Sequence, residues 1–382
     1  MKSTEEMTDD RVPPTSRSRS HAVAATGVLC LLAFCGSRIM VGPSRDAGSW
    51  DVTAAVDGWA DESSCIDCHD QPSEFAQTGH AKTLRPVSHP DSVKLLTHLA
   101  ALDAAQAEGT KIVHDQNDLY AVNESDGLQR QLKLDWCFGS GTHACTWVSA
   151  IPDSHGNTDV LEFRWTWFAS IGDFGITPGQ PETRGNSPVS ALGLLFDGPK
   201  ARRCFSCHAT VVPVSDGRIE QAHIHPGVTC QRCHGPRAKH VQTEGDYHPQ
   251  GWGSVGRMEA VRRCAVCHRL SEEHEPEEIV PGNASIVRFQ PVGLLQSACF
   301  MKSEMRCTTC HDPHRPMDQQ DSLRIQQCIQ CHDSKIDGHT TCGAGETDNC
   351  LGCHMPKVKM NFPVEFTDHW IRVPSEQTRH EP

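Results

Sequence analysis

The sequence has 382 residues, a formal net charge of −13 and 37% hydrophobic residues, with 24 Pro and 30 Gly. The length allows two or three ordinary domains, but this apolar content is low for a conventional hydrophobic core. Because no basic stripe offsets the negative charge, we expect no nucleic-acid partner. Basic or membrane-bound proteins are the expected partners, with binding that weakens as salt rises.

The first predicted element in chain order is a targeting segment at residues 1–41. Arg17 and Arg19 precede an apolar run at residues 22–34, and polar sequence follows it. This run is shorter than the roughly 20 residues that a membrane span needs. A cleaved secretory signal is the first interpretation and an uncleaved N-terminal membrane anchor the second. Cys35 leaves lipidation open, although the residue before it fits a lipoprotein box poorly.

The motif Cys-x-x-Cys-His occurs seven times, once near residue 65 and six times between residues 204 and 354. This spacing puts two thiols and an imidazole on one face of a helical turn. It is the signature of c-type haem, whose vinyl groups bond to the thiols while the imidazole binds iron. Zinc ribbons and redox Cys pairs are the alternatives, but neither needs the His. The residues are Cys65, Cys68 and His69, Cys204, Cys207 and His208, Cys230, Cys233 and His234, Cys264, Cys267 and His268, Cys307, Cys310 and His311, Cys328, Cys331 and His332, and Cys350, Cys353 and His354.

Seven covalent haems would supply the missing core, so removing them should unfold most of the chain. Attachment of haem in bacteria takes place outside the cytoplasmic membrane. The predicted location is therefore the periplasm or the outer face of that membrane, in agreement with a targeting segment.

After the first motif, residues 91–108 show the apolar spacing of a helix, in which His98 is interpreted as a surface or packing residue. Strand patterns follow at residues 119–123 and 128–134, around a turn signal. A second hairpin is expected around Gly139-Ser-Gly, and then a strand at residues 159–167. If the second hairpin is symmetric about Gly141, then Cys137 and Cys145 lie directly opposite and are bonded or in contact. Pairing of Cys299 and Cys342 stays open.

The last six motifs begin 26, 34, 43, 21 and 22 residues apart. This spacing leaves room for one or two helical turns per haem, so neighbouring macrocycles must lie close together. The segmentation is 1–41 targeting segment, 42–60 flexible linker, 61–110 first haem module and helix, 111–170 haem-free β-hairpin module, 171–203 loop connection, 204–372 six-haem array and 373–382 tail. The predicted fold class is mainly α or irregular, with a haem-packed core, short helices and a small antiparallel β insert between the first and second haems.

Outside the motifs and the targeting segment, 15 histidines remain as candidates for the second axial position of iron. His314 lies too close to His311 to reach the opposite face of the same haem, so it is predicted to bind a neighbouring haem. Bis-histidine ligation saturates iron and favours electron transfer over substrate chemistry. The predicted distal ligands are His80, His240, His314 and His369, and the further candidates are His223, His225, His274 and His339.

A set of short stretches carries a family resemblance over most of residues 60–372. These are Gly79-His80-Ala81-Lys82-Thr83, Gly139-Ser140-Gly141, Gly227-Val-Thr-Cys-Gln-Arg-Cys-His-Gly235, Ser297-Ala-Cys-Phe300, Cys307-Thr-Thr-Cys-His-Asp-Pro-His314, Cys350-Leu-Gly-Cys-His-Met-Pro-Lys357 and Phe366-Thr-Asp-His-Trp-Ile371. They resemble the multihaem c-type cytochromes related to the nitrifiers' tetrahaem electron carrier. The resemblance implies stacked haem pairs, mostly bis-His ligation and electron transfer outside the cytoplasm, and leaves one five-coordinate haem open.

Two functions are therefore weighed. The first is an electron carrier with seven haems. The alternative is a multihaem oxidoreductase that acts on a small nitrogen or sulfur compound at one open haem. For the alternative, Tyr247 with Arg232 and Arg237 nearby is the candidate site, although packing on a porphyrin edge is the simpler role for Tyr247. No catalytic residue is assigned.

Overall fold

The computed structural model describes residues 58–70, 72–102, 105, 108–115, 118–125, 127–183, 189–249, 251–333, 342 and 349–374. The predicted targeting segment, nearly all of the predicted linker and the candidate ligand His339 lie outside these described residues. Among the described residues, no helix is both long enough and apolar enough to cross a membrane.

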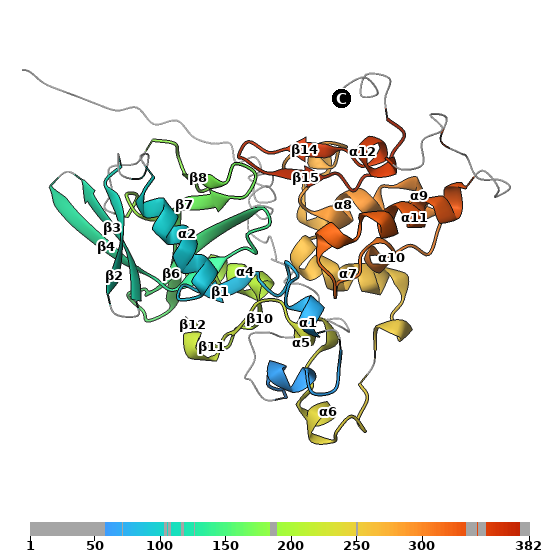
Figure 1. Cartoon of the computed structure of the whole chain (residues 1–382), viewed down its shortest axis with the longest axis horizontal. Helices are drawn as coiled ribbons and strands as arrows, with labels where there is room; N and C mark the ends of the chain where they lie inside the picture. The colour runs from blue at the N-terminus through green and yellow to red at the C-terminus, as the bar shows by residue number, and fades with distance from the viewer. Residues whose placement is uncertain are drawn as a thin grey trace, which may run out of the picture. The chain divides into compact units, whose positions relative to one another are not determined.

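Two antiparallel sheets form the β region, between residues 84 and 196 of the described chain (Figure 1). The larger sheet has the strand order β1-β5-β6-β7-β8, with β9 also paired to β7, and the smaller one has the order β2-β3-β4. The strands are β1 (Leu84–Pro86), β2 (Thr110–Asp115), β3 (Asp118–Ser125), β4 (Leu128–Leu134), β5 (Trp136–Phe138), β6 (Ala144–Pro152), β7 (Thr158–Phe168), β8 (Asp173–Ile176) and β9 (Gly193–Phe196). Strands β8 and β9 thus fall in a segment that was predicted to be loop.

Helix α2 (Pro90–Ala100) packs against the β region and closes its core. Leu96 and Leu99 are fully buried with Trp147 and Phe163. The helix is shorter than the predicted 91–108. Its last turn tightens, because the next two backbone N–H groups bond carbonyls three residues back rather than four.

The hairpin of β3 and β4 is confirmed, with the register Ser125↔Leu128 that a two-residue turn requires. The register predicted for the next hairpin is wrong, because Cys137 pairs with Trp147 rather than with Cys145. The actual register differs by two residues, which leaves both thiols on the same face. The predicted contact is nonetheless confirmed, because the two thiols, both free and buried, lie within hydrogen-bonding reach of each other. Arg85 Nη2 lies 3.7 Å from the sulfur of Cys137 and 3.3 Å from that of Cys145.

The rest of the described chain consists of short helices and two-stranded sheets with little apolar core. The α-helices are α1 (Pro72–Phe75), α4 (Gly198–His208), α5 (Cys230–His234), α6 (Ala238–Gln242), α7 (Arg257–His268), α8 (Gln290–Leu295), α9 (Ala298–Met301), α10 (Cys307–Cys310), α11 (Asp321–His332) and α12 (Cys350–His354). The 3₁₀ turns are η1 (Glu62–Cys65), η2 (Gln221–His223), η3 (Trp252–Ser254), η4 (Ser271–Glu273), η5 (Pro276–Glu278) and η6 (Met317–Gln319). The strands are β10 (Ala209–Val211), β11 (Val214–Ser215), β12 (Arg218–Ile219), β13 (His225–Pro226), β14 (Lys357–Lys359) and β15 (Glu365–Thr367).

Candidate haem sites

Each of the seven motifs, numbered here in chain order, lies on a helix or directly at its end. In α4, α7 and α11 the motif forms the last turn of a longer helix, whereas α5 and α12 consist of the motif alone. In a helix, the residues three and four positions after a given residue lie on the same face as that residue. The two thiols and the imidazole of each helical motif therefore share one face, as haem attachment requires.

Four of the motif histidines face a second histidine across a gap. The ring centroids are 6.4 Å apart for His69 and His240, 6.3 Å for His268 and His80, 6.1 Å for His234 and His314, and 6.1 Å for His311 and His369. Two metal–nitrogen bonds of about 2 Å, with about 1.1 Å more from each nitrogen to its ring centre, give roughly the same separation. The four pairs therefore fit one iron each, and the second member of each pair is one of the four predicted distal ligands.

Hydrogen bonds orient these rings. In the described residues, the Nδ1 atom of six candidate ligands lies close to an oxygen, which leaves Nε2 directed away from that partner and available to a metal. Metal-binding histidines typically have such a partner on the other ring nitrogen. The contacts are His208 with Thr83 O (3.1 Å), His240 with Tyr247 O (2.8 Å), His268 with Gln290 Oε1 (2.8 Å), His314 with Asp312 Oδ1 (3.0 Å), His354 with Arg372 O (2.8 Å) and His369 with Thr367 O (2.9 Å).

Burial favours the neutral form of five of the facing rings. Burial lowers the pKa values of His80, His234 and His311 to about 4, with smaller contributions from nearby histidines and, for His234 and His311, from arginines. Burial also lowers the pKa values of His268 and His369. These imidazoles are therefore unprotonated at pH 7, which is the form that binds a metal.

Backbone contacts hold His80 against the segment that directly precedes the third motif, although the two are far apart in sequence. The carbonyl of His80 accepts hydrogen bonds from Val228 N (2.9 Å) and Thr83 Oγ1 (2.9 Å). The neighbouring Gly227 has φ +78°, and a Cβ there would lie 2.3 Å from the carbonyl oxygen of Ala81. Only glycine can adopt this conformation at so close an approach.

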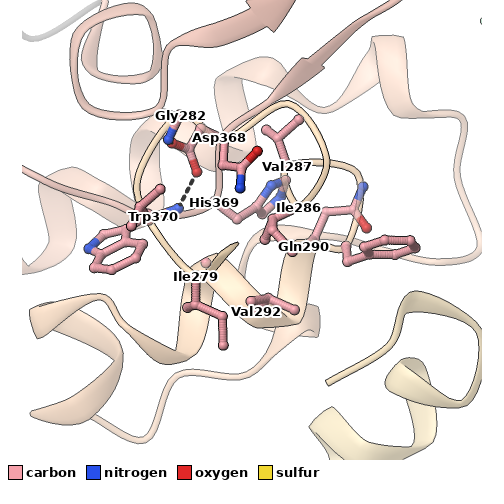
Figure 2. Close-up of a pocket in the computed structure, with 13 residues that line it drawn as sticks. Ile279, Gly282, Ile286, Val287, Gln290, Val292, Asp368, His369 and Trp370 are labelled. Atoms are coloured by element: carbon pink, nitrogen blue, oxygen red, sulfur yellow. Dashed lines mark hydrogen bonds between the residues drawn. The ribbon is translucent and has the colours of Figure 1, made fainter. Parts of the chain in front are cut away.

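Asp368 anchors the segment that carries His369 (Figure 2). Its carboxylate is 4% exposed and accepts from Gly282 N (2.8 Å) and Trp370 N (2.9 Å), and it also pairs with Arg372 (2.6 Å). Figure 2 shows His369 between this anchor and the loop that ends in α8. The carboxylate thus fixes the backbone on both sides of the candidate ligand.

Cysteines of different motifs approach one another. Thiol contacts link the first motif to the third, the fourth to both the second and the fifth, and the sixth to the seventh. Arg232 of the third motif lies 3.9 Å from the sulfur of Cys267 in the fourth, and α10 of the fifth motif packs on α11 of the sixth. Covalent attachment would convert the thiols to thioethers, so the contacts indicate proximity of the sites rather than hydrogen bonds of the mature protein. The thiol pairs are Cys65 with Cys230, Cys207 with Cys267, Cys264 with Cys307, and Cys328 with Cys350.

The second motif has a different environment. Its His208 packs against Phe138 at a centroid distance of 5.0 Å, and across the described part of the chain no histidine ring faces it. Nearby, burial raises the pKa of Glu162 to about 7, and burial together with this carboxyl raises the pKa of Cys204 to about 11. The seventh motif's His354 likewise has no facing histidine ring among the described residues.

The further predicted candidates are not brought opposite a motif histidine in the described chain. His223 is exposed and His225 is half-buried on β13. His274 packs on Phe289 (4.9 Å), and its buried Nε2 has no hydrogen-bond partner among the described residues. Tyr247 contributes its backbone carbonyl to His240, and its ring lies below Lys239.

Sequence reasoning missed the side chains and carbonyls that orient the rings. Gln290 and Asp312 are examples, and Thr83, which holds His208 through its carbonyl, is another. Asp312 is only two residues from His314, so a local search around each candidate ligand could have found it. Gln290 and Thr83 are remote in sequence and carry no such signal.

Comparison with known proteins agrees with this geometry. Residues 192–235, which include the second and third motifs, match a family model described as cytochrome c554 and c-prime. The fold is similar to that of the outer cell wall cytochrome OcwA, with a TM-score of 0.53 and 15% sequence identity over 82% of this chain and 80% of that one. The family match is confined to the part of the chain that carries the second and third motifs, and the likeness to the solved structure is one of fold.

Proposed function

We propose that this protein transfers electrons outside the cytoplasmic membrane through seven covalently bound haems, most of them ligated by two histidines. When bound, haem supplies one-electron redox chemistry. The motif cysteines would tether each macrocycle, and each motif histidine would supply a nitrogen ligand to the iron. The four facing histidine pairs, 6.1–6.4 Å apart, are the observation that carries the proposal.

The paired histidines determine which chemistry is favoured. Two imidazoles on one iron leave no position for a substrate, so these sites exchange electrons rather than bind small molecules. Their rings are held by hydrogen bonds on Nδ1, which limits rearrangement between the oxidised and reduced states.

The contacts between motifs support an order for the relay. That order is first, third, fourth, fifth, sixth, seventh, and the second site branches from the fourth. Electrons could therefore enter at one end and leave at the other without crossing a gap in the series. The branch would connect the β region to the relay, because α4 packs on β7 through the buried Ala201 and Phe205.

The net charge of −13 favours cationic redox partners. The N-terminal segment would direct export, either as a cleaved secretory signal or as an uncleaved membrane anchor.

The test combines mass and spin state of the matured protein. Mass spectrometry should give the processed polypeptide plus seven haems, and low-temperature electron paramagnetic resonance of the oxidised protein should give predominantly low-spin ferric signals. A mass equal to that of the bare polypeptide, or an absent Soret band, would refute the proposal.

A second candidate function is suggested by the second motif, since no histidine faces His208 in the described residues. In that case the protein would be an oxidoreductase that binds a small nitrogen or sulfur compound at this site. A high-spin ferric signal from about one haem in seven, altered by cyanide and absent from the Cys204→Ala/Cys207→Ala variant, would favour it. A fully low-spin spectrum would exclude it.

A further inference from the structure

The two histidines of residues 307–314 differ in what their Nδ1 atoms contact. His311 belongs to the fifth motif, whereas His314 faces His234 of the third motif. His314 Nδ1 lies 3.0 Å from a carboxylate oxygen of Asp312, whereas the buried Nδ1 of His311 has no partner among the described residues. The same short segment therefore gives two neighbouring sites opposite hydrogen-bonding environments.

Among the oriented candidate ligands described above, His314 is the one whose Nδ1 contacts a carboxylate. The others contact backbone carbonyls or, for His268, the neutral amide of Gln290. A histidine that binds a metal through Nε2 carries its proton on Nδ1, so it donates to the acceptor. A charged acceptor makes a stronger hydrogen bond than a neutral one.

The local structure holds Asp312 in this role. Its Oδ1 also accepts from His314 N at 3.0 Å, which fixes the carboxylate beside the ring. Gln320 is 1% exposed, accepts from Asp312 N (2.8 Å) and donates to Asp312 O (3.0 Å). The position of the carboxylate is therefore set by the fold of the turn and not by contact with the imidazole alone.

We propose that Asp312 is a positioning residue that lowers the reduction potential of the third haem through Nδ1 of His314. Withdrawal of the Nδ1 proton toward a carboxylate increases the electron density on Nε2, which stabilises ferric over ferrous iron. His311 lacks this contribution, because its buried Nδ1 has no partner among the described residues. The inference rests on the proposed ligation of one iron by His234 and His314.

Positive charges act against this effect. Arg315 Nε lies 3.6 Å from Asp312 Oδ2, and Arg237 lies near His234 on the other side of the site, where it lowers the pKa of that imidazole. Arg315 also pairs with Glu74 at 3.3 Å, which reduces its effect on Asp312. The contribution of Asp312 is therefore measured as a difference in midpoint potential between matched variants, and not from the absolute potential of the site.

The test is an optical redox titration of the matured full-length protein, fitted with seven one-electron transitions. In Asp312→Asn one midpoint should move upward while the other six stay in place, because asparagine keeps an acceptor for His314 but removes the charge. Arg315→Gln should move the same midpoint downward, and that downward shift should be largely lost in the double variant. Asp318→Asn, which removes an exposed charge in the same segment, is the control and should change nothing.

Unchanged midpoints in Asp312→Asn, or a shift equal to that of Asp318→Asn, would overturn the proposal. Haem mass and the number of low-spin signals are measured for every variant, and Arg315→Gln tests the same site should Asp312→Asn fail to mature. The variant His314→Ala tests separately whether His314 binds iron, on which the role of Asp312 depends. A new high-spin signal there shows that His314 is a ligand whatever the outcome for Asp312, and its absence would refute the ligation itself.

Discussion

At the scale of single residues, the sites depend on pairs of histidines that the chain brings together from remote positions. His80 and His268 illustrate this, with ring centroids 6.3 Å apart. Burial and the neighbouring His268 lower the pKa of His80 to about 4, so His80 is neutral and ready to bind a metal. Gln290 holds the opposite ring at 2.8 Å. Removing one member should therefore affect one site only.

We predict that His80→Ala converts one low-spin haem in seven into a high-spin or water-ligated haem, because His268 would then be the one histidine left to bind that iron. Electron paramagnetic resonance of the oxidised variant measures this change. His155→Ala is the matched control, since His155 has a side chain that is 82% exposed on a β turn. A low-spin count equal to that of the wild type in His80→Ala would show that His80 is not a ligand.

At the scale of elements, short helices position the ligands through close backbone contacts. Helix α8 contacts the segment that follows β15 and carries His369, and the contact is made at Gly293. A Cβ on Gly293 would lie 2.7 Å from Trp370 N and 3.0 Å from the carbonyl carbon of His369. Both atoms belong to the backbone, so they cannot rotate out of the way as a flexible side chain could.

We predict that Gly293→Ala lowers the stability by on the order of 1–3 kcal/mol and weakens the low-spin signal of the fifth haem, because α8 and the segment of His369 must separate. Chemical denaturation and paramagnetic resonance measure the two effects. Gly253→Ala is the control, because an added Cβ there would meet nothing within 4 Å. Equal stabilities for the two variants would contradict the prediction.

At the scale of the whole molecule, apolar packing is unevenly distributed. The β region has an extended core that includes Trp147, Phe163 and Leu134. In the described part of the proposed six-haem array, Phe205, Val212 and Ile224 pack on the edge of the β region, and beyond them a small separate cluster surrounds Val261 and Phe300. With haem bound as proposed, haem would supply most of the apolar contact in the array but not in the β region.

We predict that chain produced without haem attachment keeps a protease-resistant fragment covering residues 84–196, whereas the array is digested. Limited proteolysis followed by mass spectrometry identifies the fragment, and the matured protein, which should resist over both regions, is the control. This outcome would show that loss of haem unfolds the array but not the β region, whereas the sequence analysis expects most of the chain to unfold. Digestion of both regions at the same rate would contradict the prediction.

The sequence by itself determined the attachment sites, because Cys-x-x-Cys-His needs only one helical turn to bring its groups together. It also determined the hairpin of β3 and β4, whose turn signal and strand patterns are local. It did not determine the register of β5 and β6, because a shift of two residues keeps every side chain on the same face and leaves the hydrophobic pattern unchanged.

Only the tertiary structure decided which histidines face each other and what holds them. His240, His314, His80 and His369 could be proposed as a set from their surroundings in the sequence, but their partners in the first, third, fourth and fifth motifs could not. The physical reason is the separation of the residues in the sequence. The residues of a motif lie within one helical turn, whereas the two histidines of a facing pair come from segments that meet only when the chain folds. The acceptors on Nδ1, such as Gln290 for His268, depend on the same long-range packing.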